Sequence, residues 1–289
     1  MQAVILAAGR GSRLHPITLK RSKAMVPILG KPIVERVLDT IVQNGIQQVV
    51  MVVSREDSEV KRYFQEESKL PAEIQFVIQP ERLGMANALA LAAPYLHEDF
   101  VLSACDNLTP PAHVAALLAT HQAQGAQATL SLMEIDRALV QRTGVVELAG
   151  ERIVRIVEKP TPEEAPSTIS SLPLYVFSPR LLALLAAVKP SSRGEFELQD
   201  AIQLLIDQGE RVTGVFTESR LQLTNVNDLL ALNRHYLTTG DDTPQLAPQS
   251  VAPHTHLITP LHIEAGTTIG PGCVIGPRVY IERNCRIGA

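Results

Sequence analysis

The sequence lacks the features that identify several large classes of protein. Its 289 residues include no tryptophan and only three cysteines, with no CxxC pair among them. So few cysteines argue against a disulfide framework and favour a reducing compartment. No stretch approaches the roughly 18 apolar residues of a membrane-spanning helix. The apolar run at residues 3–8 is too short for a signal peptide and has no basic segment before it. We therefore expect a cytoplasmic protein that does not bind membranes.

Charge is also nearly balanced, which excludes further classes. The formal net charge is −4, so the chain has no general basic field for nucleic acid or anionic lipid. Hydrophobic residues make up 45% of the sequence and charged residues 19%, a balance that excludes extensive disorder. The length allows one large domain, or one domain and a smaller one.

Short apolar runs alternate with helix-period segments in the first half of the chain. We expect strands at residues 4–8, 49–53, 74–78 and 100–104, and helices at about 32–44, 56–66, 85–95 and 111–124. Strands rich in Val, Ile and Leu that alternate with helices predict βαβ units and a parallel sheet covered on both faces.

Strand-like runs then follow one another, as expected for a substrate lobe at about residues 127–200. These runs lie at residues 128–135, 144–148, 153–158 and 174–177. A helix after Ser178-Pro179, a helix at 198–208, a strand at 212–216 and a helix at 228–237 complete the predicted first domain, residues 1–237.

A polar, proline-containing linker is expected at residues 238–250, and a repeat follows it. Aliphatic residues recur every six positions: Val251, Leu257, Ile263, Ile269, Ile275, Ile281 and Ile287. This period fits neither a helix nor a hairpin, but it suits a parallel β-helix. Residues 251–289 resemble left-handed hexapeptide-repeat β-helices, with about two coils. An uncapped solenoid end is prone to aggregate, so we expect either a chain cut short after Ala289 or a homo-oligomer.

A basic island immediately follows the first predicted strand. The first 34 residues contain six basic residues and no acidic one. Ligands of open α/β sheets bind at the carboxyl ends of the strands. Gly9 and Gly11 let backbone amides approach an anion, so the segment predicts a polyphosphate cradle. It is not a dinucleotide fingerprint, because Leu14 replaces the required small residue, and a P-loop Gly-Lys-Ser/Thr is absent.

A family resemblance rests on three strings in this region: LAAGRGSRLHPIT at residues 6–18, SKAMVP at 22–27 and GKP at 30–32. They resemble the signature of sugar-1-phosphate nucleotidyltransferases, which include glucose-1-phosphate thymidylyl- and uridylyltransferases and N-acetylglucosamine-1-phosphate uridylyltransferases. The resemblance covers the whole chain, including the β-helix. It implies an α/β, Rossmann-like (GT-A-like) domain with a mixed, mainly parallel sheet. It also implies transfer of a nucleotidyl group from an NTP, with UTP or dTTP favoured, to a sugar-1-phosphate, giving an NDP-sugar and pyrophosphate.

The same resemblance assigns the nucleotide contacts. Arg13 would hold the β- and γ-phosphates, and Lys23 would lie against the α-phosphate. Gln79 would read the pyrimidine edge, for which its amide offers a donor and an acceptor. The other implied nucleotide contacts are Leu6, Ala8, Gly9, Gly11, Ser12, Pro80, Gly84, Met85 and Asp106.

A magnesium site is implied after the fourth predicted strand, where Cys-Asp-Asn takes the place of the family's Gly-Asp-Asn. Its carboxylate, Asp106, is a natural ligand, because Mg²⁺ prefers hard oxygen donors. Asn225 is the first choice for the second ligand. Asn227 and Asp228 are the alternatives, and Asp228 could instead cap the last helix.

The sugar phosphate would bind in the substrate lobe. Glu158 would accept hydrogen bonds from sugar hydroxyls, and Lys159 would neutralise the phosphate. The other implied contacts are Asn107, Gly144, Ser171 and Glu197, and Arg193 and residues 195–200 also fit the family. Relatives have Asn-Thr/Ala-Gly before a strand where this chain has Ser171-Leu172-Pro173, so the identity of the sugar stays open.

The predicted mechanism is an in-line attack of the sugar-phosphate oxygen on the α-phosphorus, with Arg13, Lys23, Asp106 and Lys159 as catalytic residues. A phosphate monoester needs no general base, so catalysis is positioning and charge neutralisation. Three alternatives stay open. One is a cytidylyl- or guanylyltransferase acting on another phosphate, and another is a non-catalytic subunit that binds an NDP-sugar. The third is a glycosyltransferase of similar topology, although these usually have an Asp-x-Asp motif, which Asp106 lacks.

Overall fold

The computed structural model describes residues 1–239 and 251–288 and contains two compact units. The first unit comprises Met1–Met25 and Ile33–Leu221, and the second comprises Val26–Pro32 and Gln222–Ala289. Most of the predicted linker, residues 238–250, lies outside the described residues. The predicted domain boundaries and the predicted homo-oligomer therefore stay predictions. None of the described helices is long and apolar enough to cross a membrane.

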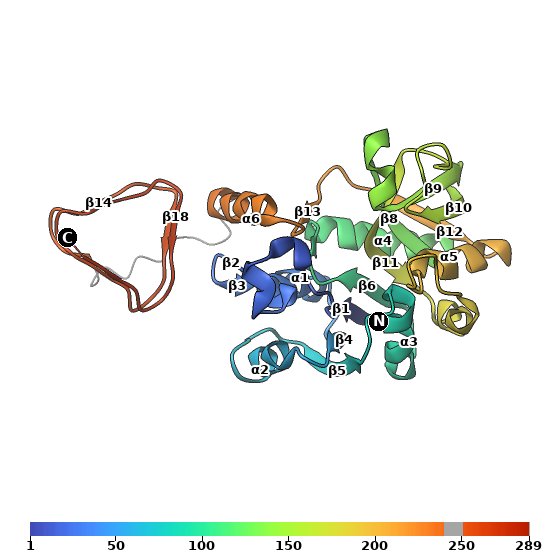
Figure 1. Ribbon diagram of the computed structural model, residues 1–289, viewed down its shortest axis with the longest axis horizontal. Coiled ribbons are helices and arrows are strands. Elements are labelled where there is room, and N and C mark those ends of the chain that lie inside the picture. Colours follow the sequence, from blue (N-terminus) through green and yellow to red (C-terminus); the bar gives the residue numbers. More distant parts are fainter. Residues whose placement is uncertain (240–250, 289) are drawn as a thin grey trace. The chain divides into compact units, whose positions relative to one another are not determined.

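A nine-stranded mixed sheet forms the centre of the first unit (Figure 1). Its strands, in spatial order, are β5 (Glu73–Gln79), β4 (Gln48–Ser54), β1 (Gln2–Leu6), β6 (Phe100–Ala104), β11 (Ile169–Phe177), β8 (Ala128–Glu134), β12 (Val212–Phe216), β10 (Arg152–Glu158) and β9 (Gly144–Ala149). The strands β5, β4, β1 and β6 are parallel, β11 runs antiparallel to its neighbours, and β8 and β12 are again parallel. The sheet is mixed, as predicted.

Helices cover both faces of this sheet. The helices of the first unit are α1 (Ile33–Val42), α2 (Ser58–Glu66), α3 (Met85–Ala92), α4 (Pro111–Gln124) and α5 (Leu198–Asp207). Short 3-10 segments are η1 (Ser12–Leu14), η2 (Ile17–Leu19), η3 (Lys23–Met25), η4 (Ala93–Tyr95), η5 (Arg137–Arg142) and η6 (Pro179–Ala187). Consecutive residues Ala3, Val4 and Ile5 of β1 are all fully buried, as a strand covered on both faces requires.

Two elements differ from the expectation. The strand predicted at residues 174–177 begins earlier, because β11 runs from Ile169 and pairs with both β8 and β9. Its register with β8 shifts between Leu172 and Tyr175, next to Pro173. Proline has no N–H for the ladder, and a bulge tolerates this loss. The helix predicted after Ser178-Pro179 is the 3-10 segment η6.

The second unit contains a hairpin, a helix and a β-helix. The hairpin strands are β2 (Pro27–Ile28) and β3 (Lys31–Pro32), and the helix is α6 (Val226–Thr239). The β-helix strands are β14 (His256–Leu257), β15 (Leu261–Ile263), β16 (Thr268–Ile269), β17 (Val274–Ile275), β18 (Val279–Ile281) and β19 (Arg286–Ile287).

The two remaining short strands, outside the β-helix, are β7 (Asn107–Leu108) and β13 (Leu221–Gln222).

The six-residue repeat forms a parallel β-helix, as predicted. Leu257 pairs with Ile275 and Ile263 with Ile281, so each strand lies beside the one three repeats later. The coils outline a triangle when viewed end-on (Figure 1). The repeated aliphatic residues point into one core. Side-chain hydrogen bonds also link successive coils. The Thr255 and Thr267 hydroxyls donate to the Gly270 and Glu282 carbonyls of the next coil.

Central strand β6 gives a stability test. Leu102 is fully buried in this strand, whereas Leu139 in η5 is 40% exposed. We expect Leu102→Ala to lower the free energy of unfolding by about 2–5 kcal/mol, because it leaves a cavity in the core. Leu139→Ala should change it by less than about 0.5 kcal/mol. Urea denaturation followed by circular dichroism measures both, and equal losses would contradict this core assignment.

Candidate active site

The predicted phosphate-binding residues lie in loops at one edge of the sheet. Because β1, β5 and β6 are parallel, the segments after Leu6, Gln79 and Ala104 all leave the sheet at their carboxyl ends. Asp106 follows β6 by two residues, and Gln79 is the last residue of β5.

The structure brings Lys23 and Asp106 into direct contact. The Lys23 Nζ donates to Asp106 Oδ2, and the two side chains are 17% and 19% exposed. The loop after β1 folds back to allow this. Gly11 has a positive φ of 64°, and a Cβ there would lie 3.0 Å from the Cβ of Lys23. The Thr18 hydroxyl donates to the Gly11 carbonyl at 2.7 Å and fixes the same turn. Arg13 is exposed, in the short η1 segment of this loop.

The residues on either side of Asp106 are buried. Cys105 donates its backbone N–H to the Leu6 carbonyl at 3.1 Å. Burial raises the pKa of the Cys105 thiol to about 12, so it stays protonated and is no nucleophile. Asn107 accepts a hydrogen bond from Arg220 Nε at 3.1 Å. Burial lowers the pKa of Arg220, and the nearby Asp106 carboxylate opposes that shift.

A tight turn after β5 holds the predicted base-binding residue. Gln79 is only 4% exposed, and its Nε2 donates to the Gly84 carbonyl at 3.3 Å and to Asn87 Oδ1 at 2.9 Å. Gly84 has φ 101°, and a Cβ there would lie 2.5 Å from the Phe196 carbonyl oxygen. Arg82 ties this turn to the first loop, because its Nε donates to the Ala8 carbonyl at 2.6 Å.

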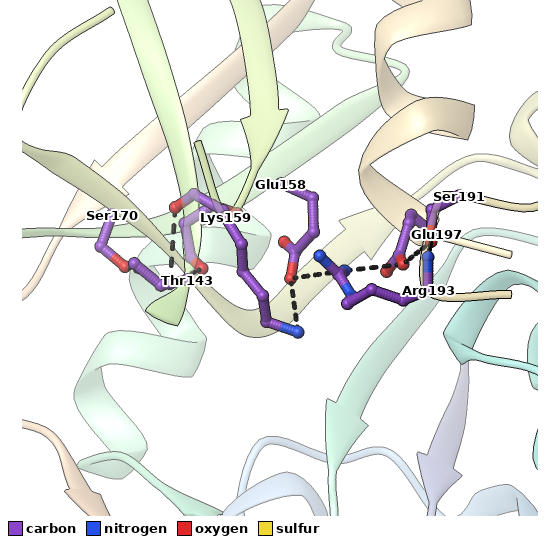
Figure 2. A network of polar contacts seen from close by, with 9 residues as sticks. Thr143, Glu158, Lys159, Ser170, Ser191, Arg193 and Glu197 are labelled. Carbon is purple, nitrogen blue, oxygen red and sulfur yellow. Dashed lines mark hydrogen bonds and ion pairs between the residues drawn. The ribbon is translucent and has the colours of Figure 1, made fainter. Parts of the chain in front are cut away.

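The predicted substrate lobe contains a network of charged side chains (Figure 2). Glu158 Oε1 lies 3.3 Å from Lys159 Nζ and 3.9 Å from the Arg193 guanidinium. Arg193 also donates to Glu197 Oε1 at 2.7 Å, and the Ser191 hydroxyl donates to the same oxygen at 2.8 Å. Two cations and two carboxylates thus lie within one small region.

Glu158 has an unused acceptor. Its Oε2 is buried and has no hydrogen-bond partner among the described residues. Burial raises the pKa of Glu158, and Lys159 partly opposes the shift. A Cβ on Gly144 would lie 3.1 Å from Oε2, so a larger residue would crowd this oxygen. Lys159 follows the strand with a positive φ of 47°, and its N–H donates to the Thr143 carbonyl at 3.0 Å.

Ser171 lies inside β11 and not ahead of it. It is buried opposite Gly144 of β9, and its hydroxyl donates to the Tyr175 hydroxyl at 3.3 Å. The neighbouring Ser170 and Thr143 hydroxyls are 2.7 Å apart (Figure 2). The Ser171 hydroxyl is therefore already bonded within the protein.

The predicted second metal ligands form the start of α6. Asn225 Oδ1 accepts the N–H groups of Asn227 and Asp228 at 2.8 and 3.2 Å. Asp228 Oδ2 accepts those of Thr224 and Asn225 at 2.7 and 2.9 Å. These reciprocal bonds satisfy donors that a helix start leaves free. Among the described residues, no three His, Cys, Asp or Glu side chains cluster as metal ligands. A nucleotide-bound Mg²⁺ needs only one or two protein carboxylates, so Asp106 fits this ion.

Sequence reasoning missed two site residues, Arg82 and Arg220, whereas Asn87 belongs to the string at residues 83–88 that resembles the family's base-binding turn. Each of the two arginines contacts its partner through a side chain, and neither belongs to a periodic pattern. Arg193 could be found from the sequence, because it is the first residue of the string RGEFELQD at residues 193–200, which resembles the family.

Comparison with known families decides the affiliation. Residues 2–239 match the family described as Nucleotidyl transferase. The chain belongs to the nucleotidyl transferase family. Residues 260–289 also match the bacterial transferase hexapeptide repeat.

Named relatives agree with this nucleotidyl transferase assignment. The chain is 34% identical to the UTP–glucose-1-phosphate uridylyltransferase AglF of Haloferax volcanii, over 74% of this chain and 87% of that protein. It is 30% identical to a glucose-1-phosphate thymidylyltransferase of Streptomyces antibioticus, over 99% of this chain and 84% of that protein. The bifunctional protein GlmU of Methanococcus maripaludis is 31% identical over 82% of this chain. The nucleotidyl transferase spans only 54% of the length of that GlmU.

Solved structures share the fold. A UDP-glucose pyrophosphorylase complexed with UDP-glucose aligns with a TM-score of 0.75 and 21% identity, over 82% of this nucleotidyl transferase and 98% of that chain. The UTP-bound enzyme of Acinetobacter baumannii aligns with a TM-score of 0.73 and 23% identity, over 86% of this chain and 96% of that chain. At these identities the likeness establishes the fold alone.

Glu158 makes the stability of this nucleotidyl transferase depend on pH. Its raised pKa means that the folded state holds the proton more tightly than the unfolded chain does. The stabilisation is complete below the ordinary carboxyl pKa of 4.5 and is lost as the pH rises through the raised value. We therefore expect Glu158→Gln to raise the denaturant midpoint at pH 7, with the gain vanishing below pH 4.5.

The exposed Glu163 provides the matched control, since Glu163→Gln should leave the midpoint unchanged at both pH values. Denaturant titrations of the three proteins at pH 4 and pH 7 test the sign. A lower midpoint for Glu158→Gln at pH 7 would show that the ion pairs of Glu158 outweigh its burial.

Proposed function

We propose that this chain transfers a nucleotidyl group from UTP or dTTP to a sugar-1-phosphate and releases pyrophosphate. The observation that carries the proposal is the contact of Lys23 with Asp106, at the strand ends where the basic loop and the predicted magnesium ligand converge. The Glu158–Lys159–Arg193 network supplies a carboxylate for sugar hydroxyls and two cations for the sugar phosphate. The activities for which the relatives AglF and the thymidylyltransferase are named support the choice of pyrimidine nucleotide and acceptor.

On the nucleotide side, the chain offers backbone amides and cations for the triphosphate. Gly9 has open space around its Cα, so a phosphate could approach the backbone there. Arg13 would hold the β- and γ-phosphates that leave as pyrophosphate. Lys23 would neutralise charge on the α-phosphate as the new bond forms. A Mg²⁺ ion held by Asp106 would neutralise phosphate charge and orient the triphosphate. Asn225, which belongs to the second unit, stays the predicted second ligand.

On the acceptor side, Glu158 would accept a hydrogen bond from a sugar hydroxyl at its unpartnered Oε2. Lys159 and Arg193 would bind the sugar phosphate, in exchange for part of their contact with Glu158. Glu197, Asn107 and Gly144 complete the proposed contacts. An oxygen of the sugar phosphate then attacks the α-phosphorus, and the bond from the α-phosphorus to the bridging oxygen of pyrophosphate breaks. Both phosphates are ionised at pH 7, so no side chain has to remove a proton.

Two alternatives use the same residues. A cytidylyl- or guanylyltransferase would share the phosphate cradle and differ at Gln79, and a regulatory subunit would bind an NDP-sugar without turnover. The Lys23–Asp106 contact favours an enzyme, because it places a cation beside the carboxylate predicted to bind Mg²⁺, and metal-assisted phosphoryl transfer uses both groups.

A substrate screen tests the activity. We expect pyrophosphate release from UTP or dTTP with at least one sugar-1-phosphate in the presence of Mg²⁺, and little release from ATP, GTP or CTP. The assay crosses five nucleoside triphosphates with a panel of sugar-1-phosphates. Fastest release from CTP or GTP would move the assignment to the first alternative. No release from any pair, combined with NDP-sugar binding in calorimetry, would favour the regulatory subunit.

Lys23 has a matched control in its own loop. We expect Lys23→Ala to lower kcat/KM on the order of 10²–10³-fold, as for other preorganised groups that stabilise transition-state charge. The exposed Lys20 carries the same charge in the same loop, so Lys20→Ala should retain kcat/KM within a few-fold. Circular dichroism establishes that both variants fold. Near-normal turnover in Lys23→Ala would exclude the proposed role.

A further inference from the structure

The side-chain amide of Gln79 is held in one orientation. Its Nε2 donates to the Gly84 carbonyl at 3.3 Å and to Asn87 Oδ1 at 2.9 Å, so both N–H bonds are engaged. Among the described residues, no hydrogen bond to Gln79 Oε1 is formed. The side chain is only 4% exposed, and free rotation of the amide would break both bonds.

The backbone decides which end of the amide lies where. The Gly84 carbonyl can only accept a hydrogen bond, so the group facing it must be the NH₂ end of Gln79. That carbonyl also accepts the N–H of Ala88 at 3.1 Å as α3 begins. Gly84 adopts φ 101°, which suits glycine. The Phe196 backbone leaves no room there for a Cβ. The Gly84 carbonyl therefore sets the orientation of the Gln79 amide. The Gln79 NH₂ group in turn requires that Asn87 present its Oδ1 to Gln79.

This orientation leaves Gln79 only an acceptor for a ligand. Uracil and thymine present an N3–H between two carbonyl oxygens, so the N3–H can donate to Gln79 Oε1. Cytosine has no hydrogen on N3, and its lone pair would face the lone pairs of the same oxygen. Next to this acceptor, the Ala86 N–H donates to the Phe196 carbonyl, whereas the N–H groups of Met85 and Asn87, in the first turn of α3, have no partner within their helix and can donate to a base carbonyl. The pair of groups matches a uracil or thymine edge.

We propose that Asn87 is a positioning residue for base selection: it holds Gln79 with its oxygen towards the base and thereby favours uracil or thymine over cytosine. This inference rests on the proposed function, because it takes Gln79 as the base contact. Asn87 itself touches the Gln79 amide and acts through it. Without Asn87, the Gly84 bond alone, at 3.3 Å, holds the amide.

Two variants at one position separate orientation from simple packing. Asn87→Leu keeps a similar volume but removes the acceptor for Gln79 Nε2. Asn87→Asp keeps that acceptor, and near the start of α3 its negative charge is favourable. For each protein we would measure kcat/KM with UTP, dTTP and CTP, using the sugar-1-phosphate that gives the fastest pyrophosphate release with the wild type.

We expect Asn87→Leu to lower the ratio of kcat/KM for the preferred uracil or thymine nucleotide to that for CTP by about tenfold, the effect of one hydrogen bond. The change should appear in KM for the nucleotide, with kcat altered less than about threefold, since base contacts are the same in ground and transition states. The KM for the sugar-1-phosphate should stay the same, which also shows that the variant folds. Asn87→Asp should keep the wild-type ratio within about twofold.

The proposal is overturned if Asn87→Leu keeps the wild-type ratio while folded, or if Asn87→Asp loses as much discrimination as Asn87→Leu. Calorimetry with UMP and CMP gives the same comparison without turnover. If the wild type releases no pyrophosphate but binds UMP over CMP, and Asn87→Leu loses that preference, the proposed catalysis fails while the role of Asn87 holds. If pyrophosphate is released and the preference survives in Asn87→Leu, the role of Asn87 alone fails.

Discussion

The ion pair between Lys23 and Asp106 is the constraint on which the candidate site depends. It joins the loop after β1 to the residues after β6, two segments separated by 83 positions in the sequence. Both side chains are mostly buried, so neither charge is fully stabilised by water, and each needs the other. The glycine at position 11 and the Thr18 hydroxyl shape the loop that delivers the lysine. A cation held beside a carboxylate at the end of parallel strands can serve a phosphate and a metal ion together.

Two further contacts extend this constraint to the rest of the site. Arg82 connects the turn after β5 to the Ala8 carbonyl, so the predicted base and phosphate segments are fixed to each other. Phe196 donates its N–H to the Leu83 carbonyl at 2.7 Å and accepts the Ala86 N–H at 3.0 Å. This backbone pairing ties the same turn to the segment that carries Arg193 and Glu197. The nucleotide and sugar sides of the first unit are thus joined through main-chain bonds, which substitutions of side chains leave in place.

Much of this fold could be predicted from the sequence, because its main elements have strong local signals. The apolar runs of β1, β4 and β6 and the six-residue period of the β-helix are such signals, and both are confirmed. The contact of Lys23 with Asp106 follows from topology, since parallel strands deliver their following loops to one edge. The bonds of Arg82, Asn87 and Arg220 could not be predicted, because each depends on a side-chain direction that no periodic pattern encodes. The early start of β11 was missed because Pro173 interrupts its apolar pattern, and the bulge that accommodates proline is a tertiary feature.

In the proposed site, residues 171–173 offer the sugar few hydrogen-bond donors. The Ser171 hydroxyl donates to the Tyr175 hydroxyl, so it is not free to donate to a ligand. Pro173 has no backbone N–H that could donate either. The charged groups of the network on this side include the carboxylates of Glu158 and Glu197 and the cations of Lys159 and Arg193. Carboxylates only accept hydrogen bonds, so a sugar hydroxyl that binds Glu158 or Glu197 has to donate. Burying Glu158 for this purpose destabilises its charged form, and its raised pKa reflects that cost. The buried acceptor at Oε2 therefore lowers the stability of the fold, as the proposed sugar contact of Glu158 would require.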